Sequence, residues 1–239
     1  MAQIHGLWGL WQLARAKVEG AEGSLLEMLD HTNAELRAQA AKILGDIRSS
    51  AANPKLLAML NDTSARVQFF AAEALGRTKA DAANAYPPLV NLLAQNNDED
   101  VYLRHAAALA MSRIGDEAAL QNLARHDNRS VRMATVLALR RMKSPSLALF
   151  LRDEDEKIVL EAARAIHDDF SVPEALADLA LLLGETASQN EPLLRRIISA
   201  NLRLGTPANA QLLANYAQNE TAPAAMRAEA LSVLGVWEK

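Results

Sequence analysis

A pattern of about a dozen residues recurs along the chain and limits what it can fold into. Clear copies are LRAQAAKILGDI (36–47), VQFFAAEALGRT (67–78), LRHAAALAMSRI (103–114), VRMATVLALRRM (131–142), IVLEAARAIHDD (158–169) and MRAEALSVLGVW (226–237), with weaker copies at 193–204 and 2–13. Apolar residues recur within each copy at helical spacing, with small residues in the middle. A shorter amphipathic run precedes most copies, so each repeat is predicted to be a helix A, a turn and a helix B.

The residues between the runs support this division into helices. Side chains that favour helix N-caps precede six of the B copies, namely Asn33, Ser64, Asp100, Asn128, Asp155 and Asn190. Prolines are expected at or near the starts of A helices, namely Pro54, Pro87, Pro145, Pro173 and Pro207. The longest irregular stretches, 79–86 and 184–190, are expected to be enlarged turns.

A single helix pair cannot bury both of its faces, whereas stacked pairs share a continuous core. The sequence therefore predicts an all-α, right-handed α-solenoid of about seven to eight repeats, with seven full pairs after a lone opening B helix. No linker is long enough to divide it, so residues 1–239 are predicted to form one solenoid. The chain is 50% hydrophobic but only 4% aromatic, which suits helices packed through small residues.

The B-helix pattern consists of an apolar residue, an arginine, paired small residues and a terminal glycine. This pattern resembles HEAT repeats over nearly the whole chain. The resemblance implies an armadillo-like helical fold that binds proteins or acts as a scaffold, and it implies no particular partner because such arrays serve many.

Composition and motifs argue against several other classes. The net charge of −4 and the absence of a long apolar run give no indication of nucleic-acid or membrane binding. The chain has no cysteine, and its five histidines lack metal-ligand spacing, so we predict no metal and no cofactor. A Ser-His-Asp arrangement stays open, but without a nucleophile elbow or a glycine-rich phosphate loop we predict that the chain is not an enzyme.

Arginine follows the first apolar residue in four B copies, at Arg37, Arg104, Arg132 and Arg227. The simplest interpretation is a structural ladder, in which each guanidinium bonds an acidic or carbonyl group of a neighbouring turn. The acidic runs 96–100 and 152–157 are expected to lie in turns between A and B helices. His31 and His126 share one repeat position with Asp62 and Asp153, and are expected to be turn residues rather than ligands.

A second set of positions points toward binding. The seventh and eleventh residues of each B copy are four apart and therefore lie on one helix face. B helices are expected to line the concave surface, where Arg77, Arg113 and Arg141 would form a row beside Leu109 and Leu137. Such a groove suits an acidic peptide or a carboxylate-bearing loop. The alternative is a solvated face whose arginines pair with Glu73, Asp168 or loop acids.

The opening stretch IHGLWGLWQLAR (4–15) carries Trp8 and Trp11, and Trp237 lies in the last copy. Neither terminal repeat shows the polar face of a cap, so we expect the chain to be a segment of a longer protein. The stretch resembles the start of the HEAT region in large secreted bacterial proteins that combine a dehydrogenase-like propeller with a haem-binding c-type cytochrome segment. That resemblance implies a periplasmic location; otherwise the chain would be cytoplasmic.

We therefore expect a non-catalytic module that binds a protein, a peptide or adjacent domains of a parent chain on its concave B-helix face. The alternative is a HEAT-like enzyme of the bilin lyase, hydroxylase or DNA glycosylase type.

Overall fold

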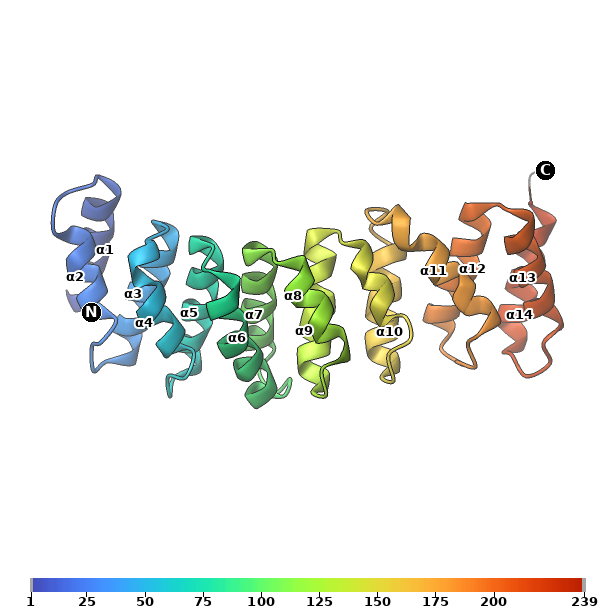
Figure 1. The fold of residues 1–239 in the computed structure, drawn as a ribbon, viewed down its shortest axis with the longest axis horizontal. Coiled ribbons are helices and arrows are strands. Elements are labelled where there is room, and N and C mark those ends of the chain that lie inside the picture. Colours follow the sequence, from blue (N-terminus) through green and yellow to red (C-terminus); the bar gives the residue numbers. More distant parts are fainter. Residues whose placement is uncertain (1, 238–239) are drawn as a thin grey trace. The chain divides into compact units, whose positions relative to one another are not determined.

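A computed structural model describes residues 2–237, and the secondary structure of these residues is entirely helical. The α-helices are α1 (Ala2–Arg15), α2 (Ala21–Met28), α3 (Ala34–Asp46), α4 (Asn53–Met59), α5 (Ala65–Thr78), α6 (Ala82–Asn96), α7 (Val101–Ile114), α8 (Glu117–Asn122), α9 (Arg129–Met142), α10 (Glu156–His167), α11 (Leu176–Leu181), α12 (Glu191–Leu204), α13 (Pro207–Gln218) and α14 (Ala224–Gly235). Short 3₁₀ helices are η1 (Ser50–Ala52), η2 (Leu123–Arg125), η3 (Pro145–Phe150), η4 (Pro173–Ala175) and η5 (Leu182–Gly184). The predicted all-α class of stacked helix pairs is confirmed (Figure 1).

The chain divides into two compact units, unit 1 (Met1–Arg141) and unit 2 (Met142–Lys239). In unit 1 the B helices α3, α5 and α7 pack side by side, and each contacts its own A helix (Figure 1). Their middle residues are the buried alanines that the repeat pattern places there, such as Ala40, Ala41, Ala71 and Ala72. Leucines of the A helices, including Leu25 and Leu56, close the other side of this core.

Two glycines let the B helices of unit 1 approach closely. A Cβ atom at Gly45 would lie 2.8 Å from the Cα of Ala74 on the next B helix. One at Gly76 would lie 2.7 Å from the Cα of Ala110. These distances are shorter than a carbon–carbon van der Waals contact, so both positions require glycine for packing reasons.

The predicted N-caps are confirmed at five of the six positions. Asn33, Asp100, Asn128, Asp155 and Asn190 each accept a hydrogen bond from a backbone N–H of the following first turn. Ser64 begins α5 without a side-chain cap bond. Its own N–H instead donates to the carboxylate of Asp62, two residues earlier.

The prediction for residues 79–86 was wrong. Helix α6 begins at Ala82, so Pro87 and Pro88 lie inside the helix rather than at its start. Asp81 caps the helix by accepting from the N–H of Asn84. Buried Tyr86 secures this extra turn, because its hydroxyl donates to the carbonyl of Met111 and accepts from the N–H of Asp116. These tertiary contacts outweigh the preference of proline for a helix start.

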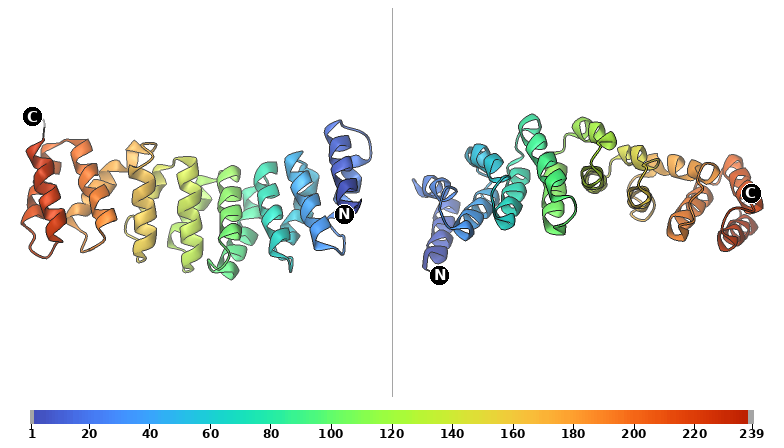
Figure 2. Two further views of the ribbon diagram at one scale, coloured as in Figure 1. Left: turned by 180° about the vertical axis from the view of Figure 1, so that it is seen from behind. Right: turned by 90° about the horizontal axis from the view of Figure 1, so that it is seen from below.

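In unit 2 the pairs α11/α12 and α13/α14 each pack together, and α12 contacts α10 and α13 (Figure 2). Buried Asn201 joins three segments, since its amide donates to the carbonyls of Ala180 and Ile197 and its oxygen accepts from Asn209. The A segment before α10 is the 3₁₀ helix η3 rather than an α-helix. No helix in the described part of the chain is long and apolar enough to span a bilayer.

The tryptophans of α1 lie in different surroundings. Trp8 is 49% exposed and contacts the ring of His5. Trp11 is partly buried, Arg15 lies over its ring, and its Nε1 is shielded from solvent without a hydrogen-bond partner. Trp11 occupies the repeat position of Gly45 and Gly76, so α1 departs there from the close packing of the later B helices.

We expect Gly76→Ala to destabilise unit 1 by about 1–3 kcal/mol, because the added methyl group overpacks the contact between α5 and α7. Thermal unfolding followed by circular dichroism measures this effect. Gly9→Ala is the matched control, since nothing lies within 4 Å of the added Cβ in α1. The control is expected to be neutral or to gain about 0.5–1 kcal/mol. Equal melting temperatures for Gly76→Ala and the unsubstituted protein would contradict the packing role.

Candidate binding surface on the B helices

The predicted arginine row comes together on the B helices of unit 1. Arg77 of α5 forms an ion pair with Asp46 of α3 and lies 3.7 Å from Glu73, one turn back on its own helix. Arg113 of α7 lies 4.0 Å from the same Glu73. Arg141, the last residue of unit 1, is exposed. The predicted alternative, in which the arginines pair with Glu73 and other acids, therefore describes Arg77 and, at the limit of ion-pair distance, Arg113.

Arg113 is the least satisfied of the three arginines. Its Nη1 is shielded from solvent and has no hydrogen-bond partner. Burial and then the positive charge of Arg77 lower its pKa; Glu73 raises this pKa, and the charge of Arg141 lowers it further. Arginine stays protonated in proteins even so. The site thus holds a guanidinium whose positive charge its neighbours do not balance.

The local charge is positive although the whole chain is negative. We define the guanidinium cluster as Arg77, Arg113 and Arg141, together with Lys42, Asp46 and Glu73. Asp46 is shared by Lys42 and Arg77, and Glu73 is shared by Arg77 and Arg113. Three basic side chains, Lys42, Arg77 and Arg113, therefore share two carboxylates, and with the charge of Arg141, which acts on Arg113, the cluster has an excess of two positive charges. A carboxylate or another anion placed there would be stabilised.

Leu109 and Leu137 occupy the seventh position of their B copies and are partly exposed. Each lies one turn before an arginine of the cluster on its own helix, Leu109 before Arg113 and Leu137 before Arg141. The five site residues predicted from the sequence thus lie on the B helices of unit 1. Two of them, Arg77 and Arg113, lie within ion-pair distance of the same carboxylate, Glu73.

An aromatic pocket on the same helices was missed by the sequence analysis. Phe69 and Phe70 of α5 and Tyr102 and Leu103 of α7 line a pocket of about 340 Å³. The rings of Phe69 and Phe70 meet edge to face at 5.1 Å, and Arg66 lies over Phe70. Tyr102 is 71% exposed at the rim. The available signal was the phenylalanine doublet in the second clear copy, where several other copies have alanine or a polar residue.

The arginine ladder is structural where its contacts are complete. Arg37 donates to both carboxylate oxygens of Asp62 on the next repeat and to the carbonyls of His31 and Thr32. Arg104 forms an ion pair with Asp98, and Arg132 donates to the carbonyls of two turn residues. Arg227 differs, because its Nε is shielded from solvent and has no partner.

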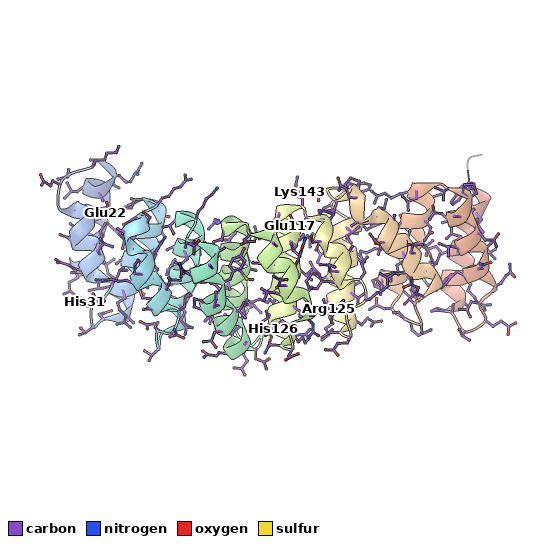
Figure 3. All side chains as sticks on the ribbon, viewed as in Figure 1. Glu22, His31, Glu117, Arg125, His126 and Lys143 are labelled. Carbon is purple, nitrogen blue, oxygen red and sulfur yellow. The ribbon has the colours of Figure 1, made fainter. Side chains whose placement is uncertain are left out.

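His31 and His126 lie in turns, as predicted, and so do the acidic runs, except for Asn96 at the end of α6 and residues 156–157 at the start of α10. His31 and His126 lie at the same edge of unit 1 (Figure 3). Each accepts a hydrogen bond through Nδ1 from a backbone N–H two residues later, which is the bond that Asp62 and Asp153 make in their turns. Within the described residues, no group of three His, Asp or Glu side chains is placed to hold a metal ion.

Unit 2 contains a hydrogen-bonded Ser-His-Asp set. His167 lies 2.9 Å from Ser199 through Nε2 and 2.9 Å from Asp168 through Nδ1. Ser199 lies in the interior of α12, so helical hydrogen bonding occupies its own N–H, and a serine nucleophile needs free donors for the oxyanion. Asp168 is also held by both Nε and Nη2 of Arg196. The set therefore acts as a polar contact between α10 and α12.

Comparisons with known proteins agree with the repeat architecture. A family model described as HEAT repeats matches residues 23–101 and 86–151, which together span more than half of the chain. No curated protein matches the sequence.

Several solved structures are similar to this chain at low identity. The HEAT-like repeats protein of Thermococcus onnurineus NA1 is 16% identical, with a TM-score of 0.49 over 96% of this chain and 91% of its own. The complex of CpcE and CpcF of phycocyanin lyase from Nostoc sp. PCC7120 is 22% identical, with a TM-score of 0.45 over 91% and 94%. Human deoxyhypusine hydroxylase is 19% identical, with a TM-score of 0.37 over 98% and 90%. At these identities and TM-scores, the similarity says nothing about the activity of this chain.

We expect Arg37→Ala to lower the free energy of unfolding by about 1.5–3 kcal/mol, because it leaves a partly buried carboxylate and two carbonyls without their donor. The side chains of Arg37 and Asp62 are only 16% and 11% exposed, respectively. Arg66→Ala is the matched control. The side chains of Arg66 and its partner Glu35 are 55% and 37% exposed, so this ion pair is expected to contribute about 1 kcal/mol or less to the free energy of unfolding. Equal losses of unfolding free energy for the two variants in denaturant titrations would contradict the structural role of the arginine ladder.

The loss of stability expected for Arg37→Ala depends on pH. Burial alone would raise the pKa of Asp62, but hydrogen bonds from Arg37 and Ser64 and the charge of Arg37 lower it below the ordinary value of 3.8. The stabilisation is therefore complete above pH 3.8 and is lost as the pH falls through the lowered pKa of the folded protein. The difference between Arg37→Ala and the unsubstituted protein should shrink over that range.

Proposed function

Because this chain belongs to the HEAT-repeat family, we propose that it is a non-catalytic interaction module that binds an acidic protein segment. The binding surface is the guanidinium cluster on α3, α5, α7 and α9, with Leu109 and Leu137 beside it. The acidic segment belongs either to a separate protein or to an adjacent domain of a parent chain.

The observation that carries this proposal is the unmet hydrogen-bonding capacity of Arg113. Its shielded Nη1 has no acceptor, and its nearest carboxylate, Glu73, is also within ion-pair distance of Arg77. Leaving a shielded polar group unpaired is costly. A carboxylate from a partner, placed against the exposed part of the Arg113 side chain, would offset the repulsion from Arg77 and Arg141.

The surface also suits recognition of a protein segment. Charge-assisted bonds to arginine give orientation and strength, and the two leucines supply apolar area next to them. The net charge of −4 argues against nucleic acid as the anion. The alternative enzyme types need features beyond the repeat fold, such as paired metal ligands on B helices or a strongly basic surface.

The resemblance of residues 4–15 to the HEAT segment of secreted dehydrogenase-like and haem-binding proteins suggests one source for the partner. In that case the acidic segment would belong to a neighbouring redox domain, and the location would be periplasmic. The reading frame around the gene tests this point directly. A propeller domain upstream and a haem-attachment motif downstream are the expected finding.

We expect Arg113→Glu to weaken binding of a fluorescein-labelled glutamate-rich peptide at least tenfold, and the double variant with Arg141→Glu to abolish it. The melting temperature should change little because neither guanidinium has a strong ion pair. Fluorescence anisotropy measures the affinity, and the peptide with glutamine in place of glutamate is the negative control.

Arg125→Glu is the matched protein control, because it reverses an exposed arginine on η2 with the same change in net charge. This variant should retain most of its affinity for the glutamate-rich peptide. Two results argue against the proposal: unchanged binding to Arg113→Glu, or a collapse of its thermal stability, which would make the cluster structural.

We expect the purified protein to lack visible absorbance and stoichiometric metal, as a non-catalytic module should. An ultraviolet–visible spectrum and an elemental assay of protein purified without chelators measure both. A coloured protein, or one metal ion per chain that survives dialysis, would favour the lyase or hydroxylase alternative.

A further inference from the structure

We propose that the partner segment binds unit 1 at two points: an aromatic side chain in the pocket between α5 and α7, and two carboxylates at the guanidinium cluster. This inference rests on the proposed function and specifies the kind of segment that the B helices recognise. The aromatic pocket is formed by Phe69, Phe70, Tyr102 and Leu103.

The pocket and the cluster lie along the same two helices. On α5, Arg66, Phe70, Glu73 and Arg77 follow one another at spacings of three or four residues, which places them on one helix face. On α7, Tyr102, Leu109 and Arg113 follow the same rule. A ligand lying along the boundary of these helices therefore reaches both points without crossing to another face.

The chemistry of the pocket selects an aromatic guest. Its walls are the rings of Phe69 and Phe70, with Tyr102 at the open rim. The charged groups beside it are already engaged, since Arg66 pairs with Glu35 and Asp100 caps α7. An aromatic ring gains edge-to-face contacts there, whereas a charged guest would find no free counter-charge.

The distance between the two points sets the spacing of the ligand residues. Phe70 precedes Arg77 by seven residues, and Leu103 precedes Arg113 by ten. At a helical rise of about 1.5 Å per residue the points are roughly 10–15 Å apart along the helices. In an extended peptide, residues i and i+4 lie on the same side and are about 13 Å apart. The recognised segment is thus an aromatic residue, three spacer residues and then acidic residues.

Two carboxylates match the charge of the site. Lys42, Arg77 and Arg113 share Asp46 and Glu73, and the charge of Arg141 also acts on Arg113, which leaves an excess of two positive charges. Two acidic residues on the same side of the extended ligand, at positions i+4 and i+6, would bring the occupied cluster to neutrality. This match indicates an acidic pair after the spacer.

The test uses the full chain and labelled peptides of glycine and serine. The first peptide carries phenylalanine, three spacer residues and two glutamates that are separated by one residue; the second has alanine for phenylalanine, and the third has only one spacer residue after phenylalanine. We expect the first to bind about tenfold more tightly than either of the others. Tyr102→Ala, at an exposed position, should remove this advantage and leave binding of the alanine peptide unchanged. Arg113→Gln should weaken all three.

The outcomes separate the two proposals. If all three peptides bind equally and only Arg113→Gln weakens them, the two-point inference is overturned and the acidic-segment function stands. If no peptide binds, or Arg113→Gln has no effect, both are overturned. An advantage of the first peptide that persists in Tyr102→Ala also overturns the assignment of the aromatic pocket.

Discussion

Close contact between neighbouring B helices is the constraint on which the rest of unit 1 depends. Gly45 meets Ala74, and Gly76 meets Ala110, at distances that exclude any larger side chain at the glycine positions. Packed helices of this kind have axes about 8–10 Å apart. Side chains at one repeat position are therefore brought close to their counterparts on the next helix.

That packing explains why the charge of the guanidinium cluster matters. Arginine occurs at the eleventh position in three successive B copies, and the close packing of α5 on α7 brings Arg77 and Arg113 within ion-pair distance of the same carboxylate, Glu73. The two nearby carboxylates do not balance the basic side chains of the cluster, and Arg113 has a lowered pKa for this reason as well as for its burial. Local conflicts of this kind are expected at functional sites, where a bound partner relieves them. The ladder shows the contrast, because the guanidinium of Arg37 donates to both carboxylate oxygens of Asp62 and to the carbonyls of His31 and Thr32.

The sequence predicted the helix pairs well because two independent signals agree there. Helical spacing of apolar residues marked each run, and Asn33, Asp100 and Asn190 marked where three of the B helices begin. The start of α6 was misjudged because proline suggested a boundary, while the buried hydroxyl of Tyr86 holds an additional turn against α7 and α8. Local patterns contain no record of such a contact between distant residues.

The site was predictable to the extent that the repeat register carries over into space. Aligning the copies placed the arginines in one row, and two of them, Arg77 and Arg113, lie near each other in the structure. The same alignment does not say which carboxylates lie near the arginines, because the sharing of Glu73 by Arg77 and Arg113 depends on how α5 packs on α7. The aromatic pocket was missed because Phe69 and Phe70 depart from the repeat pattern instead of repeating it. In an array whose scaffold is set by common residues, the departures distinguish one binding surface from another. Under the proposed two-point binding, the pocket would determine specificity more strongly than the arginines, which supply charge that many acidic segments would satisfy.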